Sequence, residues 1–328
     1  MDNLTHTAVG LFLSRAGLNR WTPRATAILL VAANIPDVDI ASAIGGPLSY
    51  LHYHRHWTHS LLAMPLMALA AVALVRVVFR TPLRWVGAFA AALIGVASHI
   101  LLDLTNTYGV RILLPFSSQW FHLDIAGFPD PWTWSILLLG ILGPFLSRLV
   151  GSEITSGGER RPRYYGRGGA IFALCVLALY DGGRGVLHAR AINTLEARLY
   201  QGVEPLRVAA CPIATSPLRW NGIVETAGFY ALAPVDLLQD FDPAHSHILD
   251  KPDPSPALDA ARATPAFQGF LRFSQFPAWR VWPDEKLENG TVVEAIDLRF
   301  GSTASPGFFA RARLDSGGRV IESSFHFR

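Results

Sequence analysis

Charged residues are scarce in this chain. Asp, Glu, Lys and Arg make up 16% of its 328 residues, whereas soluble domains carry about 25%. The shortage is greatest between residues 61 and 150, while the part from 190 to 328 has the composition of an ordinary soluble domain. The composition therefore argues against a wholly water-soluble protein. It predicts a membrane-embedded N-terminal part followed by a soluble C-terminal part.

Cysteine and lysine are also rare, and lysine occurs only at positions 251 and 286. Cys175 lies in an apolar run and Cys211 in the polar half, so a disulfide between them is not expected, and there is no CxxC motif. The net charge of +3 is too small to indicate a nucleic-acid partner. The first six residues lack the basic region of a cleaved signal peptide, so we expect the N-terminus to be retained.

Four apolar stretches have about the length that crosses a bilayer, roughly 20 residues. They cover residues 61–79, 86–104, 134–150 and 169–187. Arginines collect after the first stretch and after the third, and the positive-inside rule places both of these connections in the cytoplasm. Residues 105–133 and everything after 187 then lie on the outer side. The arginines concerned are Arg76, Arg80, Arg84, Arg148, Arg160, Arg161, Arg163 and Arg167.

The N-terminal segment fits the same orientation. Residues 4–17 and 23–35 are apolar but short for a span, so they are predicted to form a helical hairpin. Arginines cluster at the junction, which we expect to face the cytoplasm, and His6 and Asp37 then meet at the outer end. The junction arginines are Arg15, Arg20 and Arg24.

The C-terminal part has a different pattern. Short runs rich in β-branched and aromatic residues alternate with Pro and Gly, which is typical of an antiparallel β domain. Residues 243–265 are expected to be a connector that has room for a short helix. The predicted fold is a transmembrane α-helical bundle over residues 1–187, with the short hairpin and about four spans, followed by a mainly-β domain over 188–328. The runs are 206–214, 222–232, 270–276, 278–282, 291–300, 308–314 and 320–327.

Polar residues that can bind metals stand at the ends of these apolar segments. His99 and Asp103 are four residues apart on a predicted helix, so they face the same way and suit one ion. The alternative is a hydrogen-bonded pair that ties helices together. Asp37 and Asp39 follow a proline and would share a face if extended, so either could bind a metal while the other supports it or binds a second ion. A helix-end turn with solvated carboxylates is the alternative here.

A run of histidines precedes the first apolar stretch. His59 is expected near the outer face, with Thr58 as an N-cap. Arg55 could hold an anionic group, because its planar fork matches phosphate or carboxylate, or its side chain could extend to lipid headgroups. His52 and His122 are interpreted as ordinary interface residues.

His6 and Asp130 complete the candidates. His6 alone is a weak signal, but the predicted topology places it with the others. Asp130 precedes Pro131 and could be a helix cap, a ligand or a base. Histidine and aspartate at one membrane face match Zn²⁺ or a Mn²⁺/Zn²⁺ pair by ligand type. No Ser-His-Asp triad with a nucleophile elbow and no Gly-rich phosphate loop is found, so hydrolysis by metal-bound water, whose pKa falls toward ~7, is the natural chemistry.

The order of these motifs resembles a known family. It is similar to that of the bacterial inner-membrane metal-dependent hydrolases of the LexA-regulated YdjM type, over roughly residues 1–150. That family is distantly similar to zinc-dependent phospholipase C and P1-type nucleases, which implies helices around a zinc cluster and phosphoester hydrolysis. Residues 217–226 resemble the C-terminal domain of longer members, and His56 departs from the glycine expected there. The motifs are Met1-Asp2, Thr5-His6, Gly10, Pro36-Asp37, Asp39, His54-Arg55, Thr58-His59-Ser60, Ser98-His99, Asp103, Asn106, Tyr108-Gly109, Pro115-Phe116 and Asp130-Pro131.

The leading hypothesis is a multi-pass inner-membrane hydrolase with one or two divalent ions, Zn²⁺ or Mn²⁺. Arg55 would orient an anionic substrate, Asp39 or Asp130 would act as base, and a membrane lipid or lipid-linked phosphoester at the outer face is the expected substrate. A periplasmic β domain would present it, through Trp220, Trp279 and Trp282. The alternative is a non-catalytic, metal-stabilised scaffold whose β domain binds a partner or lipid; a transporter fits less well, because its sites usually lie at the midplane. The predicted metal ligands are His6, Asp37, Asp39, His59, His99 and Asp103.

Overall fold

Local signals set the first helices of the computed structural model, which describes residues 1–154 and 166–327. Helix α1 (Asn3–Ala16) begins after Asp2, whose carboxylate accepts a hydrogen bond from the Thr5 N–H at 2.9 Å. It ends at Gly17, whose φ of 146° glycine adopts without strain. A 3₁₀ turn, η1 (Leu18–Arg20), leads toward α2 (Ala25–Ala32). The predicted N-terminal hairpin is therefore present, since α1 packs on α2.

The second arm of this hairpin is longer than predicted. After α2 the chain continues as the 3₁₀ helix η2 (Ile35–Gly45), and Ala25–Gly45 together make a 21-residue apolar segment long enough to cross a membrane. The expectation that residues 23–35 form only a short helix is wrong here. Pro36 ends the α-helical bonding but is tolerated at the start of the next helical segment, because its missing N–H has no partner there.

The remaining helices largely follow the predicted apolar stretches. Residues 61–79 begin with a turn, so α4 is shorter (Met64–Phe79), while α5 (Trp85–Leu104) matches its prediction. Among the described residues, three helices are long and apolar enough to span a membrane, or four if the bent pair Pro47–His59 and Met64–Phe79 counts as one. The other helices of this part are α3 (Pro47–Tyr53), η3 (Trp57–His59), α6 (Pro131–Ile154) and α7 (Arg167–Glu196).

The last two helices of this part differ in apolar length. The apolar part of α6, Pro131–Pro144, is shorter than a span, whereas α7 has 30 residues. Of the arginines predicted for the connection between them, Arg160, Arg161 and Arg163 lie outside the described residues.

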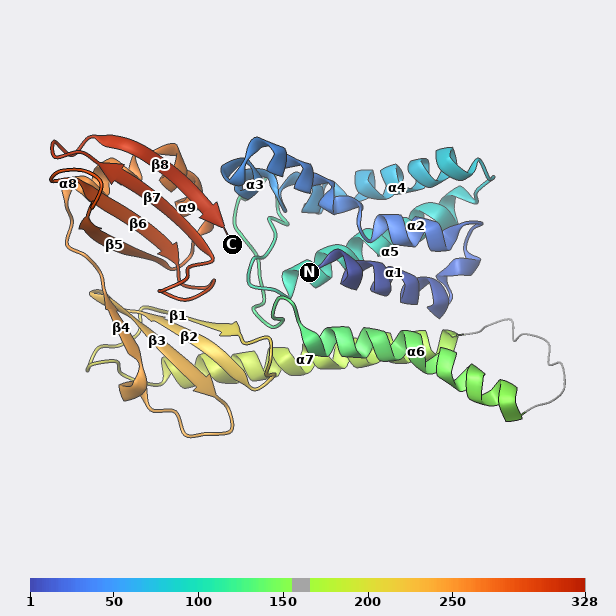
Figure 1. Cartoon of the computed structure of the whole chain (residues 1–328). Coiled ribbons are helices and arrows are strands. Elements are labelled where there is room, and N and C mark those ends of the chain that lie inside the picture. Colours follow the sequence, from blue (N-terminus) through green and yellow to red (C-terminus); the bar gives the residue numbers. More distant parts are fainter. Residues whose placement is uncertain (155–165, 328) are drawn as a thin grey trace. The chain divides into compact units, whose positions relative to one another are not determined.

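The chain divides into two compact units. Figure 1 shows their helices and strands in colours that follow the residue number. Unit 1 comprises Met1–Asp39, Arg55–Val186 and Ala214–Pro217, and unit 2 comprises Ile40–His54, Leu187–Ile213 and Leu218–Arg328. In unit 1, helices α1, α2, α4 and α5 pack side by side. Small residues line their contacts: a Cβ at Gly95 of α5 would come within 2.7 Å of the Ala32 Cβ on α2. This close approach is what glycine permits between apolar helices.

Unit 2 contains two four-stranded antiparallel sheets, with strand orders β1-β2-β3-β4 and β5-β6-β7-β8. Helices α8 and α9 pack on the second sheet, and a shared apolar core that includes Tyr230, Phe276 and Phe309 joins residues of both sheets. The fold class predicted from the sequence is thus confirmed. The bounds are β1 (Arg207–Pro212), β2 (Arg219–Glu225), β3 (Phe229–Asp236), η4 (Pro243–His245), β4 (His247–Asp250), α8 (Pro256–Arg262), α9 (Pro265–Phe273), β5 (Pro277–Pro283), β6 (Thr291–Asp297), β7 (Phe308–Leu314) and β8 (Val320–Phe327).

Two strand predictions in unit 2 are wrong. Residues 222–232 are not one strand but a hairpin, whose turn is closed by the Thr226 side chain bonding Phe229. Residues 270–276 belong mainly to helix α9, which begins with Thr264 as N-cap and Pro265 in its first turn. Its phenylalanines at 267, 270 and 273 recur at helical spacing, and all three are buried. That period outweighs the β propensity of phenylalanine.

The three tryptophans expected to present a substrate differ in exposure. Trp220 is fully buried in the core of the first sheet, and Trp279 stacks on Phe267 of α9. Trp282 is the most exposed of the three, at 36%. Trp220 therefore stabilises the fold and cannot contact a substrate.

Candidate metal centre

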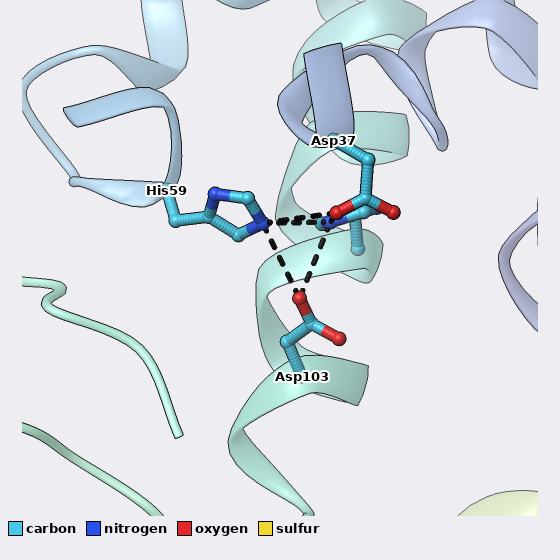
Figure 2. Close-up of side chains that lie close together, drawn as sticks. Asp37, His59 and Asp103 are labelled. Carbon is cyan, nitrogen blue, oxygen red and sulfur yellow. Dashed lines mark hydrogen bonds and ion pairs between the residues drawn. The ribbon is translucent and has the colours of Figure 1, made fainter. Parts of the chain in front are cut away.

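Four side chains from three segments of unit 1 meet in its interior. Asp37 comes from η2, His59 from η3, and His99 and Asp103 from α5. All four are buried, and His59, His99 and Asp103 have no exposed surface. Figure 2 shows Asp37, His59 and Asp103 pointing toward one another. We call these four residues the His/Asp cluster.

The donor atoms of the His/Asp cluster lie close together. The Nε2 atoms of His59 and His99 are 3.1 Å apart. Asp103 Oδ2 is 3.3 Å from each of them, and Asp37 Oδ1 is 3.5 Å from each. Ligands about 2.0–2.1 Å from a tetrahedral Zn²⁺ are separated by about 3.3 Å. The spacing therefore fits a single small cation.

Hydrogen bonds at the outer side of each imidazole fix which nitrogen carries the proton. His99 Nδ1 lies 2.8 Å from the Ala33 carbonyl oxygen, which can only accept. His59 Nδ1 lies 3.0 Å from the Thr58 hydroxyl oxygen, whose proton goes to Asp39, and 3.2 Å from Asp39 Oδ2, so both neighbours accept from it. A neutral imidazole that donates through Nδ1 has a lone pair on Nε2. With Nδ1 as the donor on each ring, both Nε2 atoms can offer a lone pair to a cation placed among the carboxylate oxygens.

Asp103 Oδ2 supplies a direct test of this fit. The atom is buried and makes no hydrogen bond in the described part of the chain. A buried carboxylate oxygen without a donor is costly. Its neighbours are two nitrogens that can offer lone pairs, so the donor set fits a divalent metal of the zinc or manganese type.

Asp39 and Thr58 hold His59 from behind. Asp39 Oδ2 accepts the Thr58 hydroxyl at 2.6 Å and the Arg55 N–H at 2.9 Å, besides facing the His59 ring. The Thr58 hydroxyl is used here and not as the N-cap of α4, because α4 begins only at Met64. Asp39 therefore orients a ligand and lies outside the four donor atoms.

His6 lies against the cluster without joining its donor set. Its ring stacks on His99 with centroids 3.9 Å apart, and its Nε2 is 3.4 Å from Asp103 Oδ1. Burial lowers the pKa of His6 to about 4, although nearby Asp103 opposes the shift, so the ring is neutral at pH 7. Neither ring nitrogen makes a hydrogen bond within the described residues.

The other two candidates have separate partners. Arg55 is buried and its guanidinium lies 2.9 Å from Asp103 Oδ1, so its charge faces a residue of the cluster. Asp130 caps α6 through the Trp132 and Thr133 N–H groups at 2.9 and 3.0 Å, and accepts the Tyr180 hydroxyl. Of the three roles considered for Asp130, the structure shows the helix cap.

Sequence reasoning missed several supporting groups. The Ala33 carbonyl carries no side-chain signal at all. Asn106, which accepts from Arg55 at 3.1 Å, enters the sequence argument only as part of a motif. The sequence predicts an interface position for His122, whereas the structure pairs His122 with Asp124 at 2.9 Å. His–Asp proximity two residues apart in a loop is a signal that could have found this pair.

Comparisons with known proteins give matches for both parts of the chain. Residues 1–191 match the family model described as YdjM inner membrane protein, and residues 256–328 match that of the YfhP C-terminal alpha/beta plait domain. The chain is also 25% identical to "Uncharacterized protein YfhP" of Bacillus subtilis (strain 168), over 94% of this chain and 90% of that protein. No solved structure matches.

Proposed function

The chain belongs to the YdjM inner membrane protein family, and from this membership and the His/Asp cluster we propose that it is a divalent-metal-dependent hydrolase. The observation that carries the proposal is the convergence of two imidazole lone pairs and two carboxylate oxygens in a buried space. Two nitrogens and two oxygens suit Zn²⁺, with Mn²⁺ as the second choice. Asp37, His59, His99 and Asp103 would hold the ion, and His6 is adjacent.

Lewis-acid activation of water and of phosphoryl oxygens is the chemistry that such an ion supplies. The protein's own residues would then orient the ligands. Of the two carboxylates considered as bases, Asp130 is occupied by the α6 cap and Tyr180. Asp39 already accepts from Thr58 and Arg55 and faces the His59 nitrogen that is directed away from the cluster, so its proposed role is to orient His59.

A lipid or lipid-linked phosphoester is the proposed substrate. His99 and Asp103 lie near the C-terminal end of α5, His59 precedes the start of α4, and Asp37 lies in the first turn of η2. Exposed tryptophans occur at element starts in the same unit: Trp57 on η3, and Trp132 and Trp134 at the start of α6. Tryptophan is enriched where a helix leaves the bilayer, which supports a site at the membrane–water interface.

The outer face of the inner membrane is the proposed side for the site. Arg80 follows the far end of α4, and Arg20 lies in η1 between α1 and α2, at the end of the hairpin away from Asp37. Basic residues favour the cytoplasmic side, so the cluster would face the periplasm together with the C-terminal part.

The alternative proposal is a metal-stabilised scaffold without catalytic activity. One observation favours it: the four ligands have almost no exposed surface, and structural zinc sites are closed in this way. Catalytic sites keep a position open for water or substrate.

One experiment separates the two proposals. Purified full-length protein would be stripped with a chelator, reloaded with Zn²⁺ or Mn²⁺, and assayed against a panel of phospholipids, polyprenyl phosphates and soluble phosphodiesters. Hydrolysis restored by metal supports the enzyme. Stable metal binding without turnover on any member of the panel supports the scaffold, and absence of metal binding contradicts both.

A further inference from the structure

The two oxygens of Asp103 face different surroundings. Oδ2 faces the Nε2 atoms of His59 and His99, each 3.3 Å away. Oδ1 faces the Arg55 guanidinium at 2.9 Å and His6 Nε2 at 3.4 Å, and it also contacts the Met1 amino group. One carboxylate thus faces two imidazole nitrogens on one side and a fixed positive charge on the other.

Arg55 is immobilised at this position. One guanidinium nitrogen lies 3.1 Å from Asn106 Oδ1 and 3.5 Å from the Gly109 carbonyl oxygen, while the other reaches Asp103. The Tyr108 ring lies under the guanidinium, with its centroid 5.1 Å away. Only 6–7% of the Arg55 surface is exposed, so the side chain has little room to move toward a substrate.

The backbone of Arg55 is also held in an uncommon conformation. Its φ of 55° lies in the left-handed region, which few residues other than glycine adopt. The Asp39 carboxylate accepts its N–H at 2.9 Å, and its carbonyl oxygen accepts from the Arg111 N–H at 3.2 Å. Strain of this kind persists where the surroundings hold the residue in place, and here it aims the guanidinium at Asp103.

We propose that Arg55 is a positioning residue: it holds Asp103 Oδ1 so that the carboxylate meets the metal through Oδ2 alone. This replaces the substrate-orienting role that the sequence suggested for Arg55, and it rests on the proposed metal centre. A carboxylate released from Arg55 could turn and offer both oxygens, which would add a ligand and change the geometry. The planar fork of arginine suits this task, because one nitrogen binds Asp103 while another stays on Asn106.

The test uses Co²⁺ as the probe, in full-length protein purified in detergent and stripped of metal. Co²⁺ affinity and the visible spectrum, which reports coordination number, would be measured for wild type, Arg55→Ala and Arg55→Lys. We expect Arg55→Ala to weaken Co²⁺ binding by about 10–100-fold, the usual cost of losing a group that supports a ligand, and to reduce the intense tetrahedral absorption. Arg55→Lys keeps the positive charge but loses the planar guanidinium, so its Co²⁺ affinity should lie between those of wild type and Arg55→Ala.

Arg111→Ala is the matched control. Arg111 is buried to a similar degree and stacks on the Trp120 ring at 4.7 Å, and alanine at this position keeps the backbone N–H that bonds Arg55. Its loss should leave the Co²⁺ spectrum unchanged. Helical circular dichroism would establish that each variant is folded, and Arg55→Lys keeps the test usable if Arg55→Ala is not.

The outcomes are distinct. A wild type that binds no Co²⁺ contradicts the proposed metal centre itself. Unchanged Co²⁺ affinity and spectrum in both Arg55 variants overturn the positioning role while leaving the centre intact. If, in addition, the Co²⁺-loaded variants bind inorganic phosphate more weakly than wild type, Arg55 is the substrate cation after all.

Discussion

At the scale of single residues, the centre depends on groups that fix the direction of a lone pair. His99 binds the Ala33 carbonyl through Nδ1, and His59 faces Asp39 through Nδ1. In both cases the outer hydrogen bond decides that Nε2 faces the cluster. Histidine ligands of metals usually have such a partner, because it sets the tautomer and the ring orientation.

The first prediction concerns the ligands. His99→Ala and Asp103→Ala should each lower the Zn²⁺ affinity by more than about tenfold, since a lost ligand costs at least as much as a lost supporting group. Metal content after dialysis against a zinc buffer, measured by plasma mass spectrometry, gives the result. His122→Ala removes a histidine that pairs with Asp124 outside the cluster, and it should retain the wild-type content. Full occupancy in both ligand variants would reject the assignment.

The second prediction concerns a buried ion pair in unit 2. Asp297 and Arg299 are almost completely buried, and the Arg299 guanidinium binds the carboxylate at 2.7 Å. Asp297→Ala leaves an uncompensated buried charge, so the free energy of unfolding of the second sheet should fall by roughly 3–5 kcal/mol. Hydrogen exchange of the β6 amides measures this loss of unfolding free energy.

Glu322→Ala serves as the control for that measurement. Glu322 is 60% exposed and lies 3.3 Å from Arg313, so its loss should change the opening free energy of β6 by at most about 1 kcal/mol. Equal effects of the two substitutions would mean that the buried pair contributes no more than a surface pair.

At the scale of elements, the approach of α2 and α5 positions the cluster. Gly95 of α5 lies against Ala32 of α2, and one turn further His99 bonds the Ala33 carbonyl. The same helix pair therefore sets both the packing distance and the orientation of a ligand.

The third prediction follows from this packing. Gly95→Leu should push α2 away from α5. The overpacking should lower the free energy of unfolding by about 1–3 kcal/mol and with it the melting temperature. Metal binding should also weaken, although no ligand is changed. Gly143→Leu on α6 is the control, because a Cβ at Gly143 has nothing within 4 Å. Thermal unfolding and Co²⁺ titration in detergent report both effects. Normal Co²⁺ affinity in Gly95→Leu would show that the helix spacing does not set the site.

At the scale of the whole molecule, orientation in the membrane decides which compartment the site serves. Arg80 and the His/Asp cluster lie at opposite ends of α4. If Arg80 faces the cytoplasm, the cluster therefore lies toward the other side of the membrane. The chain continues from the spans into unit 2 through α7 (Arg167–Glu196).

The fourth prediction tests this orientation. In a background lacking Cys175 and Cys211, Asn289→Cys should react with an impermeant maleimide in intact spheroplasts, because Asn289 is exposed in a part predicted to be periplasmic. Arg80→Cys should react only after lysis. The reverse pattern would place the C-terminal part and the cluster on the cytoplasmic side.

The broad organisation of the chain can be predicted from the amino-acid sequence. The length of the apolar stretch predicts α5, because a membrane-spanning helix needs about 20 apolar residues. The change to short runs rich in β-branched and aromatic residues predicts the sheets. Prediction from the sequence failed where two signals competed. Phe267, Phe270 and Phe273 combine a β-prone residue with a helical period, and the N-cap at Thr264 decided for the helix.

The site divides in the same way. The i, i+4 spacing of His99 and Asp103 follows from helix geometry, so the sequence alone places them on one face. The arginine-based topology also predicts that Asp37 and His59 lie at the same face. The tertiary structure brings the donor atoms of these four residues together, directs Arg55 at Asp103 and makes Asp130 the cap of another helix. These relations depend on contacts between segments far apart in the chain and on a backbone carbonyl at Ala33, neither of which the identity of a single residue encodes.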